Sequence, residues 1–147
     1  MSSDGSSVTF RRVFADVRPR AIQSFARKLE REVVKGRPFD TLITGDAELQ
    51  RLNRQYRGKD YATDVLSFPD ETTARLGDLA ISAGRARAQA RDFGHSTETE
   101  IRILMLHGVL HLAGMDHESD SGAMARAEKR WRARLGLPNG LIERVSS

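Results

Sequence analysis

The sequence predicts a single α+β domain, in which about four strands form a sheet that about five helices cover. The chain has 147 residues, a length that suits one domain with one hydrophobic core. Hydrophobic residues make up 39% of the chain, which is typical of a globular protein and excludes a collagen-like or wholly disordered one. Strand-like and helix-like runs follow one another without an internal repeat or a linker, so we expect residues 8–147 to fold as one unit.

The first half of the chain is predicted to begin with a disordered tail and to contain two strands and two helices. Pro19 suits the first turn of a helix, and apolar residues then recur every three or four positions until Gly36 and Pro38 stop the pattern. Gly45 ends the second strand, and Asp46 is a typical cap for the next helix. The expected elements are a tail at 1–7, a strand at 8–14, a helix from 19, a strand at 39–44 and a helix at 47–56.

The second half is predicted to contain a hairpin of two strands followed by three helices. Pro69 and Gly77 bound the polar loop that joins the two strands. Thr97, with Glu100 three residues later, fits a capping box at the start of a largely apolar, buried helix. Gly136 suits the end of the last helix. The expected elements are strands at 65–68 and 78–82 and helices at 83–93, 97–114 and 121–135.

The composition narrows the choice of metal ligands and partners. The chain has no cysteine, so a metal would have to bind His, Asp or Glu side chains. Its net charge is +4, and 20 of its 24 basic residues are arginine, whose guanidinium makes bidentate contacts with phosphate, so an anionic partner is favoured. The polar amino terminus lacks the features of a signal peptide, and no apolar run has the length of a membrane span. We therefore expect a cytoplasmic protein with no membrane partner.

Three of the four histidines lie close together, at His107, His111 and His117. Residues four apart lie one above the other on a helix, so the first two imidazoles can reach one ion, and Gly114 can turn the chain to bring in the third. Three imidazoles suit zinc, with nickel or copper as alternatives, and they leave the open position that catalytic zinc sites have. Two other interpretations stay open: a structural metal whose site Asp116 or a remote glutamate closes, and histidines that line a polar seam of the helix.

The spacing of these histidines copies the long metallopeptidase motif His-Glu-x-x-His-x-x-Gly-x-x-His, but Gly108 stands where that motif has its glutamate. The glutamate is the general base of the peptidases, and glycine cannot replace it. A phosphodiester hydrolase depends less on such a base when a metal activates water and a cation stabilises the charge on phosphorus. The pattern therefore favours phosphoryl chemistry over peptide hydrolysis.

Three motifs occur in order along the chain: the run LNRQYRGKDYATDVLSFP at 52–69, the tripeptide Gly-Asp-Leu at 77–79, and the histidine stretch at 107–117. Together they resemble the bacterial YbeY family over about residues 40–135, with no departure at the three histidines. The resemblance implies a YbeY-like metallohydrolase domain at 8–147. It also implies a single-strand-specific, zinc-dependent endoribonuclease that acts in ribosomal RNA maturation, at the 3′ end of 16S RNA, and in ribosome quality control.

By the same resemblance, one zinc ion per chain would lie on His107, His111 and His117, and Arg57 would be the functionally important arginine. Arg57 is expected at the end of a helix, where its guanidinium can hold a phosphate. An arginine at that position can instead simply interact with the negative end of the helix dipole. The sequence alone favours this second interpretation, and the resemblance favours the first.

The remaining candidates are polar residues with a structural and a functional interpretation each. Asp64 and Ser67 can form a turn, and the hydroxyl of Ser67 can also face a substrate groove. For both residues the structural role is favoured over the functional one. Asp116 either hydrogen-bonds to His117 or favours a turn. A row of arginines on one helix is expected to contact the RNA backbone or to form a solvated face: Arg85, Arg87 and Arg91. The basic residues of the last helix are expected either to line the same RNA path or, with Glu128 interspersed, to form a solvated face: Arg126, Lys129, Arg130, Arg132 and Arg134.

The leading hypothesis is thus a zinc endoribonuclease whose partners are single-stranded RNA, ribosomal RNA or ribosomal subunits. Either zinc-bound hydroxide or a nearby 2′-hydroxyl would attack phosphorus, while Arg57 stabilises the developing charge. One alternative is a zinc metallopeptidase, which the histidine spacing supports and Gly108 weakens. The other is a non-catalytic ribosome-assembly factor with a structural zinc, which would unfold when the metal is removed.

Overall fold

The computed structural model describes residues 5–12, 14–58, 63–71, 74–116 and 119–138. In this part of the chain, one mixed sheet has the strand order β1 (Ser7–Phe10), β2 (Phe39–Thr44), β4 (Gly77–Ser82) and β3 (Val65–Pro69). The first three strands are parallel, whereas β3 pairs with β4 as an antiparallel edge strand. The predicted hairpin of β3 and β4 is therefore confirmed, and so is the predicted α+β class.

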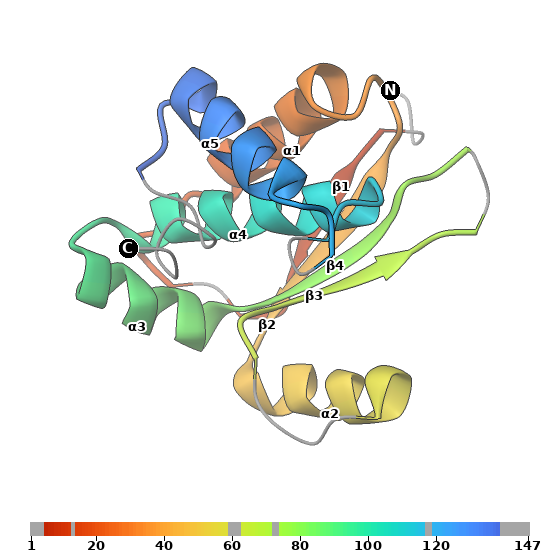
Figure 1. The fold of residues 1–147 in the computed structure, drawn as a ribbon. Helices are drawn as coiled ribbons and strands as arrows, with labels where there is room; N and C mark the ends of the chain where they lie inside the picture. The colour runs from red at the N-terminus through yellow and green to blue at the C-terminus, as the bar shows by residue number, and fades with distance from the viewer. Residues whose placement is uncertain (1–4, 13, 59–62, 72–73, 117–118, 139–147) are drawn as a thin grey trace.

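Five helices surround the sheet in the described residues, as the sequence predicts. Figure 1 shows α2 on one side of the sheet and α1, α4 and α5 on the other, with α3 packed beside α4. Their bounds are α1 Pro19–Glu32, α2 Asp46–Arg57, α3 Ala83–Phe93, α4 Thr97–Leu112 and α5 Ala123–Leu135. None of the helices in the described residues is long and apolar enough to cross a membrane.

The predicted histidine helix, α4, forms the centre of the core. Thirteen of its sixteen residues are buried, because the sheet covers one side of the helix and α1 and α5 cover others. Leu104 and Met105 of α4 are fully buried together with Ile22 of α1 and Met124 of α5. A second, smaller cluster lies on the other side of the sheet, where Leu49 of α2 packs on β3 and β4. The confirmed burial of α4 fixes the backbone that carries the histidines.

The start of α4 differs from the predicted capping box. Ser96, one residue earlier than expected, is the cap, and its hydroxyl accepts a hydrogen bond from the Thr99 amide at 3.0 Å. Glu100 does not close the box; it is fully buried, and its carboxylate lies 2.6 Å from Nε2 of His95. The capping box was thus the wrong interpretation, because burial beside a histidine gives this carboxylate a stronger partner than a helix terminus.

Smaller differences occur at two other element ends. Gly45 is the cap of α2, so Asp46 is the first helical residue rather than the cap. The first strand is shorter than expected, since it ends at Phe10. Ser6, which the sequence assigned to a disordered tail, is buried: its hydroxyl donates to Glu30 at 2.7 Å and accepts from the Phe39 amide at 2.9 Å. Residues 5–7 therefore belong to the fold, because this serine hydrogen-bonds to the Glu30 carboxylate of α1 and to the Phe39 amide at the start of β2.

Candidate functional site

Two of the three predicted histidines lie together in the second half of α4. The ring centroids of His107 and His111 are 4.9 Å apart and the rings are inclined by 73°. His107 is buried and His111 is half-buried. The predicted third ligand, His117, lies outside the described residues. Within the described residues, no group of three or more His, Cys, Asp or Glu side chains could hold a metal ion.

Gly108 sets how closely the histidine helix approaches the sheet. A Cβ atom at this position would lie 2.6 Å from Cδ2 of Leu79 on β4, so the buried Leu79 side chain would have to shift to admit any larger residue. On the neighbouring strand, the hydroxyl of Ser67 donates to the Gly108 carbonyl at 3.3 Å. The glutamate of the metallopeptidase motif would therefore require Leu79 to move, so the packing of α4 on β4 favours glycine at this position.

The tripeptide motif at the start of β4 serves the same close packing. Gly77 has a φ of +147°, and a Cβ atom there would lie 2.9 Å from Cδ2 of Leu112, the last residue of α4. Leu79 of the same motif lies under Gly108. Two motifs that are far apart in the sequence thus form one packing unit, which holds the carboxyl end of α4 against the hairpin.

A buried glutamate of α5 contacts one member of the histidine pair. Oε2 of Glu128 lies 2.8 Å from Nδ1 of His107, and Glu128 is only 1% exposed. The sequence interpretation of Glu128 as part of a solvated face is therefore wrong. Its position contained a signal, because Met124 lies four residues before it and Trp131 three residues after it, on the apolar side of the same helix.

The pair has the arrangement that metal-binding histidines have in proteins. A carboxylate at Nδ1 holds the ring proton there and turns Nε2, with its lone pair, toward a ligand. The ring of His111 adds a second imidazole on the same face of α4. The two residues therefore fit a zinc ion by their chemistry and by the orientation that Glu128 imposes on His107.

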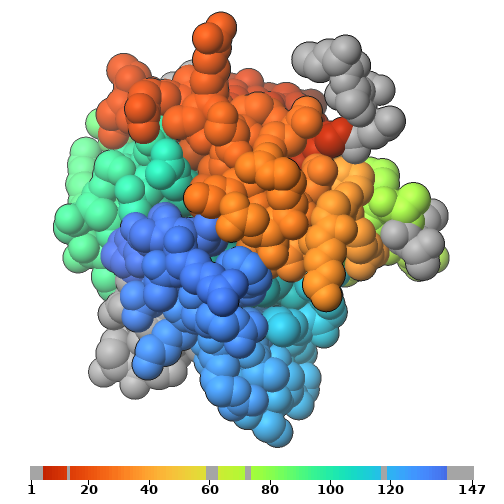
Figure 2. Space-filling model, turned by 90° about the horizontal axis from the view of Figure 1, so that it is seen from above, coloured from red at the N-terminus to blue at the C-terminus, as the bar shows by residue number. Residues whose placement is uncertain are grey.

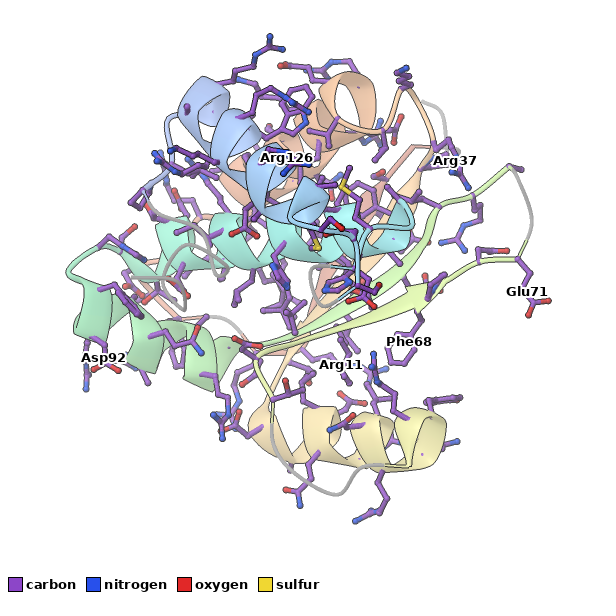
Figure 3. The ribbon with its side chains drawn as sticks, viewed as in Figure 1. Arg11, Arg37, Phe68, Glu71, Asp92 and Arg126 are labelled. Atoms are coloured by element: carbon purple, nitrogen blue, oxygen red, sulfur yellow. The ribbon has the colours of Figure 1, made fainter. Side chains whose placement is uncertain are left out.

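Arg57 lies on the opposite side of the sheet from the histidines. It is the last residue of α2, exposed, and followed by Gly58, whose left-handed backbone ends the helix. Figure 3 shows Phe68 of β3 pointing toward α2, and its ring centroid is 5.7 Å from that of Tyr56. The neighbouring Ser67 contacts α4, so the edge strand β3 lies between Arg57 and the histidines. The structure does not bring these residues into direct contact within its described part.

Asp64 and Asp116 take part in local backbone structure. The carboxylate of Asp64 accepts hydrogen bonds from the Val65 amide at 2.8 Å and from Nε2 of Gln89 at 3.1 Å, which ties the start of β3 to α3. The carboxylate of Asp116 accepts from the hydroxyl of Ser119 at 3.2 Å, and its carbonyl accepts from the Ser119 amide. These contacts account for turn-forming roles of both residues.

The three arginines of α3 are exposed but have different surroundings. Nε of Arg85 lies 3.9 Å from the carboxylate of Asp46, and the guanidinium of Arg87 lies 4.6 Å from the ring centroid of Phe14. Arg91 lies in the last turn of the helix. The row is thus a mixture of contacts rather than one uniform charged surface.

The amino end of α4 is anchored by a charged contact at the far end of the helix from the histidine pair. Glu98 accepts hydrogen bonds from the amide of Arg18 at 2.9 Å and from its guanidinium at 2.7 Å, and from Arg102 at 3.0 Å. The hydrogen bond from the Arg18 side chain is the main reason why the pKa of Glu98 is lowered. The contact joins the first turn of α1 to the first turn of α4.

Comparison with known proteins places this fold in a family. The family model described as Endoribonuclease YbeY matches residues 9–136, so the similarity extends well before the three motifs. The chain is 71% identical over 146 residues to the Endoribonuclease YbeY of Solibacter usitatus, which covers 99% of each chain. It is 42% identical over 139 residues to that of Koribacter versatilis, which covers 95% of this chain and 91% of the relative.

The fold agrees with a solved structure as well. A solution structure of a protein from Thermotoga maritima matches with a TM-score of 0.60 and 25% sequence identity, over 88% of this chain and 93% of that one. The sequence motifs, the packing unit around Gly108 and the full-length similarity therefore agree. The chain belongs to the YbeY family of endoribonucleases.

Proposed function

We propose that this protein is a single-strand-specific, zinc-dependent endoribonuclease of the cytoplasm that matures ribosomal RNA at the 3′ end of 16S RNA and takes part in ribosome quality control. The family supports ribonuclease chemistry on an RNA substrate. The observation that carries the proposal is the buried contact between Glu128 and His107 beside the ring of His111. A carboxylate that orients a buried histidine is typical of a metal ligand.

The metal would be held by His107, His111 and His117, one zinc ion per chain. Such an ion supplies Lewis acidity, which activates water and draws charge from the phosphodiester. Glu128 keeps His107 in one tautomer and one orientation, so the ligand is in place before substrate binds. The tight seat of Gly108 on Leu79 keeps both histidines at a fixed position over β4.

Arg57 would hold the scissile phosphate from the other side of the edge strand. Its guanidinium carries a fixed charge, and α2 is anchored to the sheet by Leu49. A substrate strand that contacts both Arg57 and the histidines must cross the edge of the sheet at β3. An edge strand leaves room for such a crossing because no further strand pairs with its outer side among the described residues.

The other candidates have supporting roles in this proposal. Ser67 lies on β3 between Arg57 and the histidines, where its hydroxyl fixes the Gly108 carbonyl. Asp64 and Asp116 shape the turns before β3 and after α4. The exposed arginines of α3 would contact the RNA backbone without reading its bases: Arg85, Arg87 and Arg91.

The test combines metal analysis with an RNA cleavage assay. We expect about one zinc per chain in the purified protein, and cleavage of single-stranded RNA that a chelator abolishes and added zinc restores. The His111→Ala variant should lose both the zinc and the cleavage. Stoichiometric zinc in a His107→Ala/His111→Ala variant would contradict the assignment of the ligands.

Folding after metal removal separates this proposal from the assembly-factor alternative. If the metal is catalytic, the chelated protein keeps its circular dichroism spectrum and its cooperative unfolding while cleavage stops. If the protein unfolds on chelation, the zinc is structural. The ribosomal role is tested by incubating the enzyme with isolated small subunits that carry unprocessed 16S RNA, where trimming of the 3′ end is expected and its absence would contradict this substrate.

A further inference from the structure

Positive charge is concentrated on two helices of the protein. Residues 18–37, which include α1, contain seven basic and two acidic side chains, and α5 contains five basic and one acidic. Together these two segments carry a net charge of +9, although the whole chain carries only +4. The rest of the chain is therefore negative, and the protein is strongly polarised.

The two helices lie next to each other on one face of the molecule. Figure 2 looks down on this face and shows α1, in orange, beside α5, in blue. On α5, exposed arginines recur every four residues, at Arg126, Arg130 and Arg134, and Figure 3 labels the first of them on this helix. We call the exposed cationic side chains of this surface the α1–α5 face: Arg20, Arg31, Lys35, Arg126, Lys129, Arg130 and Arg134.

The charges of the α1–α5 face are not neutralised by carboxylates. Elsewhere arginines form ion pairs, as Arg11 does with Glu48 at 2.7 Å and Arg75 with Asp40 at 2.7 Å. No ion pair between described residues includes a member of the α1–α5 face. Like charges four residues apart on a helix repel one another, so this surface is suited to a ligand with closely spaced negative charges.

The side chains of the face indicate which kind of polyanion fits. Its members are arginines and lysines, and the large apolar side chains that are exposed in the described residues, Tyr56 and Phe93, lie on α2 and α3 instead. Trp131 of α5 is half-buried, with the guanidinium of Arg134 5.3 Å from its ring. Single-stranded RNA is bound by aromatic stacking on its bases, whereas paired RNA is bound through phosphates and helical shape. The face therefore suits paired RNA.

Helix α5 separates the α1–α5 face from the histidine pair. The inner side of α5 carries Glu128, which contacts His107, and the outer side carries Arg126 and Arg130. We propose that the α1–α5 face binds the phosphate backbone of a paired RNA segment that adjoins the single strand to be cleaved. This inference rests on the proposed ribonuclease function, and it adds a second, sequence-independent contact to the same substrate.

The test compares three double variants that each remove two positive charges. Arg20→Gln/Arg31→Gln changes α1, and Lys129→Gln/Arg130→Gln changes α5; glutamine keeps the helix propensity. The control, Arg12→Gln/Arg51→Gln, changes two exposed arginines outside the face. Binding is measured with an uncleavable RNA duplex over a range of salt concentrations, by fluorescence anisotropy. Because the duplex is not cleaved, the result stays readable even if the proposed catalytic function is wrong.

We expect each variant of the α1–α5 face to bind the duplex about tenfold more weakly at moderate salt. The slope of log affinity against log salt concentration should become shallower by roughly one to two, because up to two phosphate contacts are lost. The control should change the affinity by less than about twofold, apart from the small effect of net charge. Equal weakening by the control, or unchanged binding in both face variants, would overturn the proposal.

Cleavage links the face to the substrate. For a single strand joined to a duplex, the face variants should raise KM about tenfold with little change in kcat, and they should affect the isolated single strand much less. An equal rise of KM for both substrates would show that the face does not recognise paired RNA.

Binding of vesicles with anionic lipid is measured in parallel. A loss of binding that is confined to vesicles, with RNA affinity unchanged, would assign the face to a membrane surface and overturn the proposal.

Discussion

The two sides of the sheet are covered in very different ways. On one side, α4 has thirteen of its sixteen residues buried, and it carries His107 and His111. On the other side, α2 has two of its twelve residues buried, and it ends at the exposed Arg57. Two of the three proposed metal ligands thus lie on the most buried helix, whereas the proposed phosphate-binding arginine lies at the end of a lightly packed one.

This difference suits the two tasks. Metal ligands need fixed distances, which a helix that is enclosed on several sides provides. A side chain that follows a flexible RNA strand around the edge of β3 needs reach more than fixed geometry. Substitutions on the α4 side should therefore change stability and metal binding together, whereas substitutions on the α2 side should change catalysis alone.

The largest effect is expected for Gly108→Glu, which installs the glutamate of the metallopeptidase motif. Its Cβ would collide with Leu79, and its carboxylate would enter the apolar contact between α4 and β4. We expect a loss of more than about 4 kcal/mol in the free energy of unfolding, measured by chemical denaturation, and no peptidase activity. A stable, peptide-cleaving variant would contradict the packing argument.

A graded series isolates the collision from the charge. Gly108→Ala should cost about 1–3 kcal/mol, although alanine is the better helix former, because it overpacks the same contact. Combining it with Leu79→Ala should cost less than the sum of the two single changes, since the smaller residue makes room for the new methyl group. If the two free-energy costs add up in the double variant, contact with Leu79 is not the reason why position 108 requires glycine.

The second prediction concerns the α2 side. Arg57→Ala should lower the rate of single-stranded RNA cleavage about 10²-fold, the size of effect seen when one preorganised charge stabiliser is removed. Zinc content should stay the same, and the free energy of unfolding should change by less than about 0.5 kcal/mol, because Arg57 is exposed. Arg57→Lys should restore little activity, since a point charge does not reproduce the planar guanidinium.

Arg54→Ala is the matched control, because it removes the same charge one turn earlier on α2. Cleavage near the wild-type rate by Arg57→Ala would remove Arg57 from the mechanism. A lower zinc content in that variant would instead make Arg57 part of the metal site, and the separation between the two sides of the sheet would fail.

The sequence was most informative where a pattern repeats along one element. The apolar periodicity of α1, the largely apolar run of α4 and the glycines and prolines between elements predicted the α+β class and most element boundaries, because each of these signals is local in the sequence. The spacing of His107 and His111 predicted that their rings meet, since one helical turn separates them. Both results depend on a single element.

Contacts between elements were harder to predict. Glu128 is a carboxylate of α5 whose histidine partner lies 21 residues earlier, on α4, so its own sequence neighbours did not reveal the contact. Gly108 looked like a missing catalytic base, and only the approach of Leu79 shows why glycine is required there. The position of Arg57 across the sheet likewise depends on topology, which the histidine motif does not contain.

The third prediction compares two buried carboxylates that each pair with a histidine. Glu128→Gln should weaken zinc binding about 10- to 100-fold, measured by competition with a chelator of known affinity, because His107 loses the charge that orients its ring. Glu100→Gln disturbs the pair with His95 at the other end of α4 and should leave zinc affinity unchanged in the folded protein. Equal losses in the two variants would mean that Glu128 acts only through stability.

The smallest effect is expected at the amino end of α4, where Glu98 contacts Arg18. The side-chain hydrogen bond from Arg18 lowers the pKa of Glu98 below its ordinary value of 4.5, so the folded state favours the ionised form. The contact therefore stabilises the protein at pH values above 4.5 and loses this contribution as the pH falls through the lowered pKa. Because Arg18 is largely exposed, we expect Glu98→Gln to cost only about 1 kcal/mol at neutral pH.

The pH dependence of this cost tests the argument. The difference between wild type and variant in the free energy of unfolding should shrink steadily below pH 4.5, whereas Glu32→Gln, on the exposed side of α1, should show a smaller cost at every pH. A cost of Glu98→Gln that stays constant down to strongly acidic pH would show that the carboxylate acts through its shape and not through its charge.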